Sequence, residues 1–587
     1  MSQLDLLRKA TCLEDLAQLV NFKPQAITYI LFKLTDTQKF AEFEISKQSG
    51  GKRTISAPTQ RLKRLQKNLA DLLANCLTEL EARGERKTPF VHGFVKERSI
   101  ATNAKNHRNK RWVLNLDLHD FFGTINFGRV RGILIKDRNF SLNPTVATLI
   151  AQISCYKNTL PQGAPTSPII SNIVARPLDL KLVDLAKRYG CNYTRFADDI
   201  TFSTNKADFP EQLAKIATGT MHGWVLGEKI SVTVAKAGFV ENPKKTRLQY
   251  CRNRQEVTGL VVNKRVNVTR EYRKTVRAML NRLVTTGKFE LPPDRVHRIG
   301  NKSTKQVDPL RQLQGMLGFI DWIDLRSDAN ARHLSQEAQA HTKTKSHRLE
   351  GLTSQEKQYR KFLLYRDFFS AQQPVILTEG KTDKSHLRVA AVQLGSGYPE
   401  LVDTTGTHPE VLFRIFPSLA RRTNALLGLC GGTSDLASFL HSYKNETKKF
   451  NLSQMGQPIV VMVDKDSGWN AIGSSIGGGA DGSKPFYHVC TNLYVVCIPP
   501  PSGKEVGCIE DLYTQETLDK ELDGKLFDKS NNTKDKGKHY GKTYFVEKIV
   551  LPNAAKIDFS GFKPLLARLT TVVQDHRKKL SSPKLTP

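Results

Sequence analysis

Several features that mark other protein classes are missing from this sequence of 587 residues. It has no run of eighteen or more uncharged apolar residues, which excludes a typical membrane-spanning helix. Its start, MSQLDLLRKA, lacks the apolar core of a signal peptide. The nine cysteines are scattered and form no CxxC pair, which disfavours a disulfide framework and a zinc site. We therefore expect a cytoplasmic protein with reduced thiols and no membrane partner.

Acidic residues are scarce relative to basic ones. The chain holds 89 Lys and Arg against 56 Asp and Glu, a formal net charge of +33. A surplus of this size favours a polyanionic partner, with nucleic acid as the first candidate and a membrane surface as the second. Hydrophobic residues make up 39% of the chain, so packed cores can form, and the length predicts two to four domains.

Apolar periodicity predicts regular elements in the N-terminal half. Leucines at helical spacing predict a helix over 61–77 that buries one face. Residues 112–118 and 193–203 are rich in β-branched, aromatic and Leu residues, which favours strands. Basic residues recur at helical spacing over 270–284 and predict a helix with a basic face.

The C-terminal half has a different pattern. A polar stretch over about 327–357 predicts a linker, and an aromatic helix is expected over 359–369. Apolar strands starting at 374 and 458, separated by helical stretches, predict an α/β unit with a parallel sheet. Two segments are expected to be irregular: a flexible basic loop over 522–543 and a disordered tail over 576–587.

Two adjacent aspartates, Asp198 and Asp199, stand in the mostly apolar stretch RFADDITFS (195–203). At a tight turn the alternation of a strand breaks, so both carboxylates can reach one side. Mg²⁺ would offset their repulsion, and two such ions would stabilise the attacking and leaving oxygens of a phosphoryl transfer. Asp117, at the end of WVLNLDL (112–118), is the candidate third carboxylate. Taken alone, the pair is explained better by a surface turn.

Further motifs occur in order around these carboxylates. They are GGKRTISAP (50–58), HGFVKERSI (92–100), LNLDLHDFF (114–122), LPQGAPTSP (160–168), FADDI (196–200) and NPKKT (242–246). In these motifs and their order, the chain resembles a reverse transcriptase over about residues 20–325. The resemblance implies a right-hand fold within residues 1–330, with fingers and palm over about 20–263 and a thumb over about 264–330.

The resemblance implies roles for individual residues. Asp117 and Asp198 would hold two Mg²⁺ ions, with Asp199 as a weaker ligand or a support. Phe122 would lie under the sugar of a dNTP and reject a 2′-hydroxyl. Lys245 would approach the leaving pyrophosphate, and a surface lysine is the alternative for it. The implied substrate-binding residues are Arg53, Phe122, Gln162, Gly163 and Lys245.

Two short elements, NAKNH (103–107) and VTG (257–259), resemble signatures of retron reverse transcriptases. A plain strand or loop explains VTG about as well. The resemblance implies a bacterial enzyme that binds its cognate structured non-coding RNA (msr–msd) and primes from a guanosine 2′-hydroxyl. Its product would be branched multicopy single-stranded DNA (msDNA). The implied nucleic-acid-binding residues are Asn103, His107, Arg270, Arg273, Lys274 and Arg277.

A second set of acids follows the C-terminal strands. Glu379 and Gly380 end PVILTEG (374–380), and Asp464 and Asp466 end the strand that starts at 458. Carboxylates beyond the C-termini of parallel strands lie at the functional edge of a sheet, and the i and i+2 side chains share a face. Residues 372–575 resemble a Toprim domain, the Rossmann-like metal-binding module of topoisomerases, primases and OLD-type nucleases.

This second resemblance implies Mg²⁺ or Mn²⁺ held by catalytic acids. The expected ligands are Glu379, Asp464, Asp466 and Glu510, and the further candidate nuclease residues are Asp383, Asp511 and Lys542. For Glu510 and Asp511 a helix N-terminal acid is the alternative. The chain has no room for the tyrosine domain of a topoisomerase and no zinc module of a primase. Hydrolysis by a metal-activated water, and so a nuclease, is the remaining simple choice.

The expected fold class is multidomain, α+β followed by α/β. A retron reverse transcriptase would be joined through residues 331–371, a linker and a connecting helix, to a Toprim nuclease effector. The resemblance implies a role in antiviral defence. Two alternatives stay open: a Toprim part that binds nucleic acid without cleaving it, and a polymerase of the group II intron type. The nuclease substrate (RNA or DNA), the infection trigger and the formation of a homo-oligomer also stay open.

Overall fold

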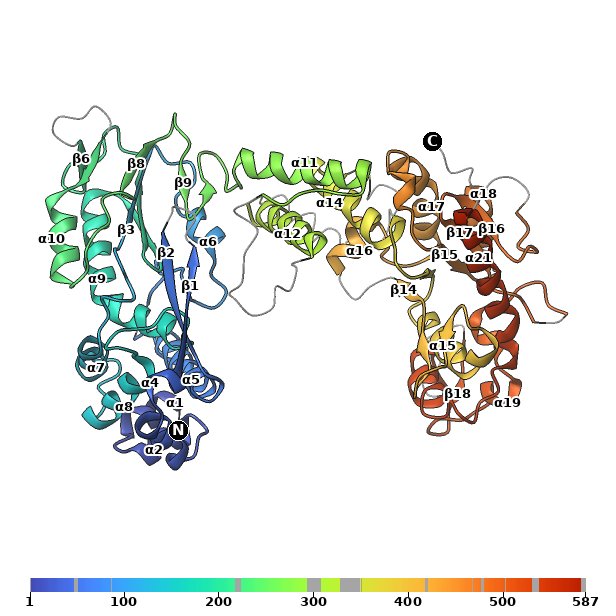
Figure 1. Ribbon diagram of the computed structural model, residues 1–587, viewed down its shortest axis with the longest axis horizontal. Coiled ribbons are helices and arrows are strands. Elements are labelled where there is room, and N and C mark those ends of the chain that lie inside the picture. The colour runs from blue at the N-terminus through green and yellow to red at the C-terminus, as the bar shows by residue number, and fades with distance from the viewer. Residues whose placement is uncertain are drawn as a thin grey trace. The chain divides into compact units, whose positions relative to one another are not determined.

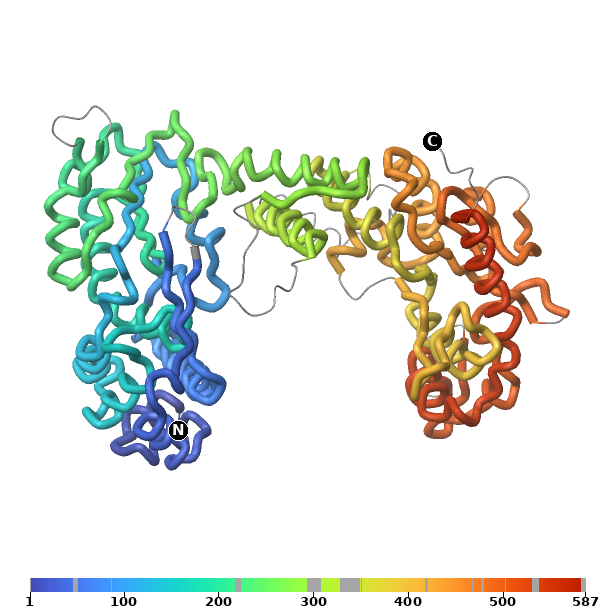
Figure 2. Tube along the Cα trace, viewed as in Figure 1, coloured from blue at the N-terminus to red at the C-terminus, as the bar shows by residue number. Residues whose placement is uncertain are grey.

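The computed structural model describes residues 2–46, 51–85, 87–216, 223–292, 308–327, 349, 351–416, 421–466, 468–476, 480–501, 503–529 and 538–581. These residues form two compact units, and the path of the chain through each can be followed in Figure 2. The first unit contains the described residues up to Arg273, with 292 and 322–327. The second contains 274–291, 308–321 and the described residues from 349 onward. None of the described helices is both long and apolar enough to cross a membrane.

A four-stranded antiparallel sheet forms the framework of the first unit, with the strand order β4-β5-β3-β8. Two of its strands, β3 and β8, are labelled in Figure 1. The strands predicted over 112–118 and 193–203 are confirmed, the second as a hairpin of two strands. Its turn is formed by Ala197, with φ +56°, and Asp198. The strands are β3 (Trp112–Asp117), β4 (Asn192–Phe196), β5 (Asp199–Thr204) and β8 (Arg247–Tyr250).

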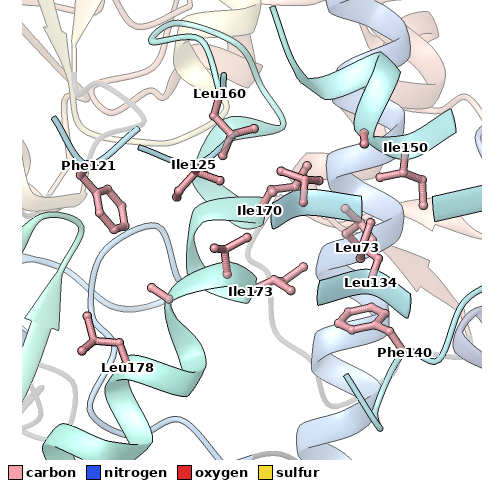
Figure 3. Packing of buried hydrophobic residues seen from close by; sticks show 14 of the residues in the cluster. Leu73, Phe121, Ile125, Leu134, Phe140, Ile150, Leu160, Ile170, Ile173 and Leu178 are labelled. Atoms are coloured by element: carbon pink, nitrogen blue, oxygen red, sulfur yellow. The ribbon is translucent and has the colours of Figure 1, made fainter. Parts of the chain in front are cut away.

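Helices bury their apolar faces in one hydrophobic core of the first unit, part of which is shown in Figure 3. Leu73 of α5 (Gln60–Ala82) and Ile170 and Ile173 of α9 (Ser167–Tyr189) point into this core. The predicted helix over 61–77 is therefore confirmed, and its apolar stripe is core. The other helices in this region are α6 (Ile100–Lys105), α7 (Phe127–Lys136), α8 (Pro144–Ser154) and α10 (Glu228–Lys236).

Hairpins and short N-terminal helices complete the first unit. In the first hairpin, β1 and β2 pair from Phe40↔Pro58 to Ser46↔Lys52. The hairpin strands are β1 (Phe40–Ser46), β2 (Lys52–Pro58), β6 (Ala214–Ile216), β7 (Trp224–Leu226), β9 (Glu256–Val257) and β10 (Leu260–Val261). The N-terminal elements are α1 (Gln3–Lys9), α2 (Leu13–Leu19), α3 (Pro24–Thr28), the π-helical turn η1 (Tyr29–Lys33) and α4 (Asp36–Lys39).

The two helices expected to form a thumb contribute most of their residues to the second unit. The backbone N–H of Asn451 donates to the carbonyl oxygen of Val284 on the first of them, at 2.8 Å. Asp321 on the other pairs with Arg422, which also contacts Glu356 at 2.7 Å. The division between the units thus falls near residue 273 and inside the predicted thumb. The helices are α11 (Arg270–Thr286), α12 (Pro309–Ser327), α14 (Ser354–Leu364) and α16 (Arg421–Leu427).

A five-stranded sheet forms the framework of the second unit, in the order β14-β11-β15-β17-β16. The first four strands of this order run parallel, and β16 pairs antiparallel with β17 at one edge. Strands β11 and β15 are buried over their whole length, as strands covered on both faces are. The predicted parallel sheet is confirmed. Its strands are β11 (Val375–Thr378), β14 (Arg414–Phe416), β15 (Ile459–Val463), β16 (Tyr487–Cys490) and β17 (Leu493–Cys497).

The remaining elements of the second unit are short strands and helices. They are η3 (Tyr365–Phe369), α15 (Asp383–Gln393), η4 (Gly395–Gly397), β12 (Val402–Asp403), β13 (Glu410–Val411), α17 (Thr433–Thr447), η5 (Leu452–Gln454), α18 (Trp469–Ile476), η6 (Ile509–Leu512), α19 (Gln515–Leu518), β18 (Leu526–Phe527), β19 (His539–Tyr540), α20 (Lys542–Tyr544), η8 (Phe545–Val550), η9 (Ser560–Phe562) and α21 (Lys563–Ser581).

Three expectations about irregular segments need correction. The aromatic helix starts earlier, at Ser354, because Thr353 and Glu356 form a capping box; residues 328–348 of the predicted linker lie outside the described residues. The predicted disorder of the tail is wrong up to Ser581, because the buried stripe of α21 continues to His576. Within the predicted basic loop β18 pairs with β19, and 530–537 lie outside the described residues.

Candidate active sites

Three carboxylates meet at one end of the first sheet. Asp117 is the last residue of β3, Asp199 is the first of β5, and the two are directly paired across the strands. Asp198 occupies the hairpin turn, and its carbonyl oxygen accepts the N–H of Leu118 at 3.0 Å. The predicted convergence of the three acids is therefore what the sheet register produces.

The protein surroundings disfavour negative charge at this end of the sheet. Burial raises the pKa of Asp198, and the negative charge of Asp117 adds to the rise. Burial raises the pKa of Asp199 to about 6, reinforced by the neighbouring charges of Asp198 and Asp117. Lys245 opposes both shifts. Two adjacent acids with raised pKa values, Asp198 and Asp199, next to a third acid fit a site that binds cations, because cations offset the repulsion between the carboxylates.

Lys245 is the cation that meets Asp117 in this arrangement. Its Nζ lies 2.7 Å from Oδ1 of Asp117, and the hydrogen bond raises the pKa of Lys245. Asn242 donates to Oδ2 of the same carboxylate at 3.1 Å. Both oxygens of Asp117 are therefore engaged by protein groups. Among the described residues, no three His, Cys, Asp or Glu side chains form a ready-made metal site. The side chain of Lys245 is 56% exposed, so it can leave Asp117 toward solvent.

The other expected substrate-binding residues lie on separate segments of the first unit. The carbonyl oxygen of Gln162 accepts the N–H of Ser56 on β2 at 2.9 Å, which ties the loop before α9 to the β1–β2 hairpin. Gly163 has φ +118°, and a Cβ there would lie 3.2 Å from the Ser56 carbonyl oxygen, so a larger residue is strained. Arg53 on β2 is exposed, and its positive charge lowers the pKa of Asp198. Phe122 is half-buried, next to Phe121 and Phe94.

A buried ion pair behind the turn was missed by the sequence reading. Arg195 and Asp179 are both fully buried, and Nε and Nη2 of the arginine donate to the two carboxylate oxygens at 2.7 and 2.8 Å. Arg195 also donates to the carbonyl oxygen of Ala197 at 3.1 Å, beside Asp198. The hydroxyl of Tyr193 donates to Asp179 at 2.7 Å. This network holds the turn that carries Asp198. In the sequence, the only signal for it was Arg195, the first residue of RFADDITFS (195–203).

Asn103 and His107, expected to bind nucleic acid, are fully buried instead. The ring nitrogens of His107 form hydrogen bonds with the hydroxyls of Ser203 and Thr194, both at 2.7 Å, and burial lowers the pKa of His107 to about 3. Direct contact with nucleic acid is therefore excluded for both in this conformation. Asn103 lies in α6, which packs against β9 and β10, and His107 follows this helix. Thr258, in the turn between β9 and β10, donates to the carbonyl oxygen of Ile100 at 3.4 Å, so the NAKNH and VTG elements support each other.

The expected basic face of α11 loses one member. Arg273 forms hydrogen bonds with Asp324 and Asn267, and its side chain is only 17% exposed. It therefore holds α11 to α12 and is not presented to solvent. The exposed basic residues of this face are Arg270, Lys274 and Arg277.

A second group of acids lies at the C-terminal edge of the parallel sheet. Glu379 directly follows β11 and Asp464 directly follows β15, two neighbouring strands. Asp383 opens α15 and accepts the N–H of Gly380 at 2.7 Å. Glu510 in η6 is fully buried and pairs with Lys542 at 3.0 Å. The sequence predicted this group, including Asp383 and Lys542 as further candidates.

Negative charge is strongly disfavoured in this second group. Burial raises the pKa of Asp464 to about 8, and the negative charge of Asp383 adds to the rise. Glu510 and Glu379 act in the same direction, and Lys542 opposes them. Oδ1 of Asp464 and Oε2 of Glu379 are buried and have no hydrogen-bond partner in the described part of the chain. Unpartnered carboxylate oxygens in such a group fit a divalent cation.

Two further expected members, Asp466 and Asp511, accept hydrogen bonds from backbone N–H groups close to them in the chain. Asp466 is exposed and accepts the N–H of Gly468 at 2.8 Å, because the chain turns into α18 and does not continue the strand. Asp511 caps η6 through the N–H of Cys508 at 3.0 Å and pairs with Lys529 at 2.7 Å. The helix-terminal alternative thus describes Asp511. Thr433, at the start of α17, donates to Glu379.

Comparison with known proteins concerns the N-terminal part of the chain. Residues 45–262 match the family model described as reverse transcriptase (RNA-dependent DNA polymerase). This part of the chain is similar to retron reverse transcriptases. A retron Mx65 reverse transcriptase from Myxococcus xanthus is 37% identical over 257 residues, covering 41% of this chain and 55% of the relative.

Two further relatives have the same description. A retron Mx162 reverse transcriptase from Myxococcus xanthus is 32% identical, over 53% of this chain and 64% of its own. A retron Ec86 reverse transcriptase from Escherichia coli is 29% identical, over 54% of this chain and 85% of its own. The chain thus spans between about half and two thirds of the length of the two Myxococcus relatives.

Proposed function

We propose that the first unit is the RNA-directed DNA polymerase of a retron. The observation that carries the proposal is the convergence of Asp117, Asp198 and Asp199 at one end of an antiparallel sheet, within the segment that matches the reverse transcriptase family. Reverse transcriptases use Mg²⁺ at a two-metal site, where the ions stabilise the attacking and leaving oxygens of nucleotidyl transfer. Asp117 and Asp198 would hold these ions, and Asp199 would support them.

The protein's own residues then bind and orient a dNTP. Arg53 pairs with its triphosphate by charge-assisted hydrogen bonds. The half-buried ring of Phe122 closes the space under the sugar, which excludes a 2′-hydroxyl. Gly163 lets the chain approach the nucleotide without a side chain in the way. Lys245 leaves Asp117 and moves toward the phosphates, where its charge offsets the negative charge that develops on the leaving group.

The retron assignment specifies the nucleic acids. The enzyme binds a cognate structured RNA (msr–msd), primes from a guanosine 2′-hydroxyl and makes msDNA, as the retron relatives' descriptions and the NAKNH and VTG elements support. A group II intron type of polymerase is the alternative. The DNA beside the gene separates the two, because a structured RNA with inverted repeats immediately upstream is expected only for a retron.

The polymerase assignment is tested by primer extension on an RNA template with dNTPs and Mg²⁺. Asp198→Asn removes one metal-binding charge, so we expect synthesis to fall by roughly ten-thousandfold, the scale of an essential catalytic group. Asp120→Asn is the matched control: Asp120 is exposed three residues from Asp117, and the variant should retain full activity. Undiminished extension by Asp198→Asn would refute the assignment.

For the second unit we propose a Toprim-type, metal-dependent nuclease that acts as an effector in antiviral defence. The observation that favours it is the group of Glu379, Asp383, Asp464 and Glu510 beside Lys542, at the C-terminal edge of a parallel sheet. Bound Mg²⁺ or Mn²⁺ would activate a water for attack on a phosphodiester. Glu379 and Asp464, with their free oxygens, would hold it, and Lys542 would stabilise the charge that develops on the phosphate.

The alternative for this unit is a nucleic-acid-binding module that cleaves nothing. Full-length protein is incubated with labelled RNA and DNA strands in Mn²⁺, and products are resolved on a gel. We expect cleavage by the wild type and by Asp523→Asn, an exposed control, and none by Asp464→Asn. Synthesis by Asp464→Asn should be unchanged. Strands that bind but stay intact with the wild-type protein would favour the alternative.

A further inference from the structure

A hollow of about 410 Å³ on the first unit is lined by none of the acidic-site residues. Its volume lies within the range of about 300–1,000 Å³ that is usual for ligand sites. Both aromatic and cationic side chains line it. The lining residues are Phe22, Ala26, Tyr29, Ile30, Arg61 and Arg64.

The apolar part of the lining comes from the N-terminal helices. Ile30 is buried, and half-buried Phe22 packs against the hydrophobic core. Tyr29 is different, because 46% of it is exposed. It opens η1, the π-helical turn that continues α3, and π-helical turns recur at functional sites. The core therefore does not explain why an aromatic ring is presented here to solvent.

The cationic part of the lining comes from α5. Arg61 and Arg64 are one turn apart and exposed, and Lys63 and Lys67 beside them are exposed as well. In the described part of the chain no carboxylate forms an ion pair with any of the four. Like charges one turn apart destabilise a helix by a few tenths of a kcal/mol, roughly 0.2–0.5 kcal/mol per pair. Helix stability therefore does not account for this cluster either.

We propose that this pocket binds one unpaired nucleotide of the structured RNA, with its base against Tyr29 and Phe22 and its flanking phosphates on Arg61 and Arg64. Unpaired bases in RNA loops are recognised by stacking on aromatic rings, and arginine matches the geometry of phosphate. A recessed pocket can hold a single planar ring that protrudes from its partner. A flat lipid or protein surface has no such ring to insert. The inference rests on the proposed function, because it names where the polymerase unit holds its RNA.

Binding is measured by fluorescence anisotropy on full-length protein with a labelled RNA hairpin that has an unpaired loop. A blunt RNA duplex of the same length is the second probe. Tyr29→Ala should weaken hairpin binding by about tenfold, the scale of one lost base–aromatic stack, and leave duplex binding unchanged. Tyr29→Phe keeps the ring and should bind as the wild type does, which separates loss of stacking from loss of fold.

The arginines are tested by the double variant Arg61→Gln, Arg64→Gln. Its matched control is Lys187→Gln, Arg188→Gln on α9, which removes two exposed positive charges from the same unit. The first pair should weaken hairpin binding by about tenfold and the control by less than about twofold, because only the first removes phosphate partners at the pocket. Equal losses for the two pairs would show general electrostatic attraction and overturn the proposal.

Two further readouts complete the test. If Tyr29→Ala weakens binding of a DNA hairpin of the same sequence as much as that of the RNA hairpin, the pocket takes any single strand and the RNA assignment is overturned. Primer extension on a preformed template–primer should be retained by every pocket variant. Failure of extension by the wild type would refute the proposed polymerase and leave the binding result, measured separately, to stand or fall by itself.

Discussion

The two units neutralise buried carboxylates in different ways. In the first, Asp117 is paired with Lys245, whose side chain is 56% exposed and free to move into solvent. In the second, the partner of the fully buried Glu510 is Lys542, whose side chain is 26% exposed. Asp464 nearby has a pKa raised to about 8, against about 6 for Asp199 in the first unit. In the first site a bound metal ion can replace Lys245. In the second site Lys542 stays with Glu510, and the negative charge of Asp464 has to be neutralised by a proton or a bound cation.

Away from the acidic sites, the more deeply buried arginine–aspartate ion pair is in the first unit. The first unit encloses Arg195 and Asp179 completely, and the guanidinium of Arg195 also donates to Asn172 and to the carbonyl oxygen of Ala197. The second unit holds α12 through Arg422, whose side chain is 37% exposed. A fully buried ion pair in the first unit thus stands against a partly exposed one in the second. Substitutions in matched pairs can break this comparison.

The largest expected loss of stability is that of Arg195→Met, and Arg422→Met is its counterpart in the second unit. The first leaves Asp179 buried without its partner, and we expect it to lower the free energy of unfolding by about 3–5 kcal/mol. The second leaves the largely buried Asp321 and Glu356 without their partner, but both keep some access to water, so a smaller loss of about 2 kcal/mol is expected. Urea unfolding measures both. A double variant, Arg195→Met with Asp179→Leu, should regain most of the loss, and equal losses for the two single variants would contradict the contrast.

The two lysines give smaller losses. Lys542→Met strands the buried Glu510, so we expect a loss of about 3 kcal/mol. Lys245→Met leaves Asp117 with the amide of Asn242 and a route to water, so about 1 kcal/mol is expected. Thermal unfolding in EDTA compares them. Were Lys245→Met the more damaging of the two, the view of Lys245 as a replaceable cation would be wrong.

The smallest expected effect is a pH dependence in the first unit. Burial holds the pKa of His107 at about 3, whereas 6.5 is the value of an unperturbed histidine. Between these values the unfolded chain binds a proton that the folded chain does not, so stability falls as pH falls from 6.5 toward 3. Each pH unit well inside this window removes about 1.4 kcal/mol.

Urea unfolding of the wild type and of His107→Asn at pH 6.5 and 5.5 measures this contribution. The variant should show a slope smaller by about three quarters of a proton, because the unfolded histidine is only half protonated at pH 6.5. His441→Asn, at an exposed position of the second unit, should retain the wild-type slope. An unchanged slope in His107→Asn would mean that the imidazole is not held neutral.

The local sequence pattern was sufficient to predict most helices and strands and the proximity of Asp117, Asp198 and Asp199. The strand ending in Asp117 and the turn at Asp198 could be predicted because alternation and a paired acid are short-range signals. The burial of Asn103 could not, because it depends on what α6 packs against. Arg195 was missed for the same reason: its partner Asp179 is set by packing between α9 and β4, which no local pattern encodes.

The grouping of α11 and α12 with the second unit has a consequence for how the gene can be divided. A cut within 328–348 separates Asp321 from Arg422, and it leaves Val284 on one fragment and Asn451 on the other. An N-terminal fragment ending there would carry two helices stripped of their neighbours, and the C-terminal fragment would lack them. Exchange of whole modules between related genes is therefore expected to succeed when the junction lies before α11, near residue 270, and to fail at the linker.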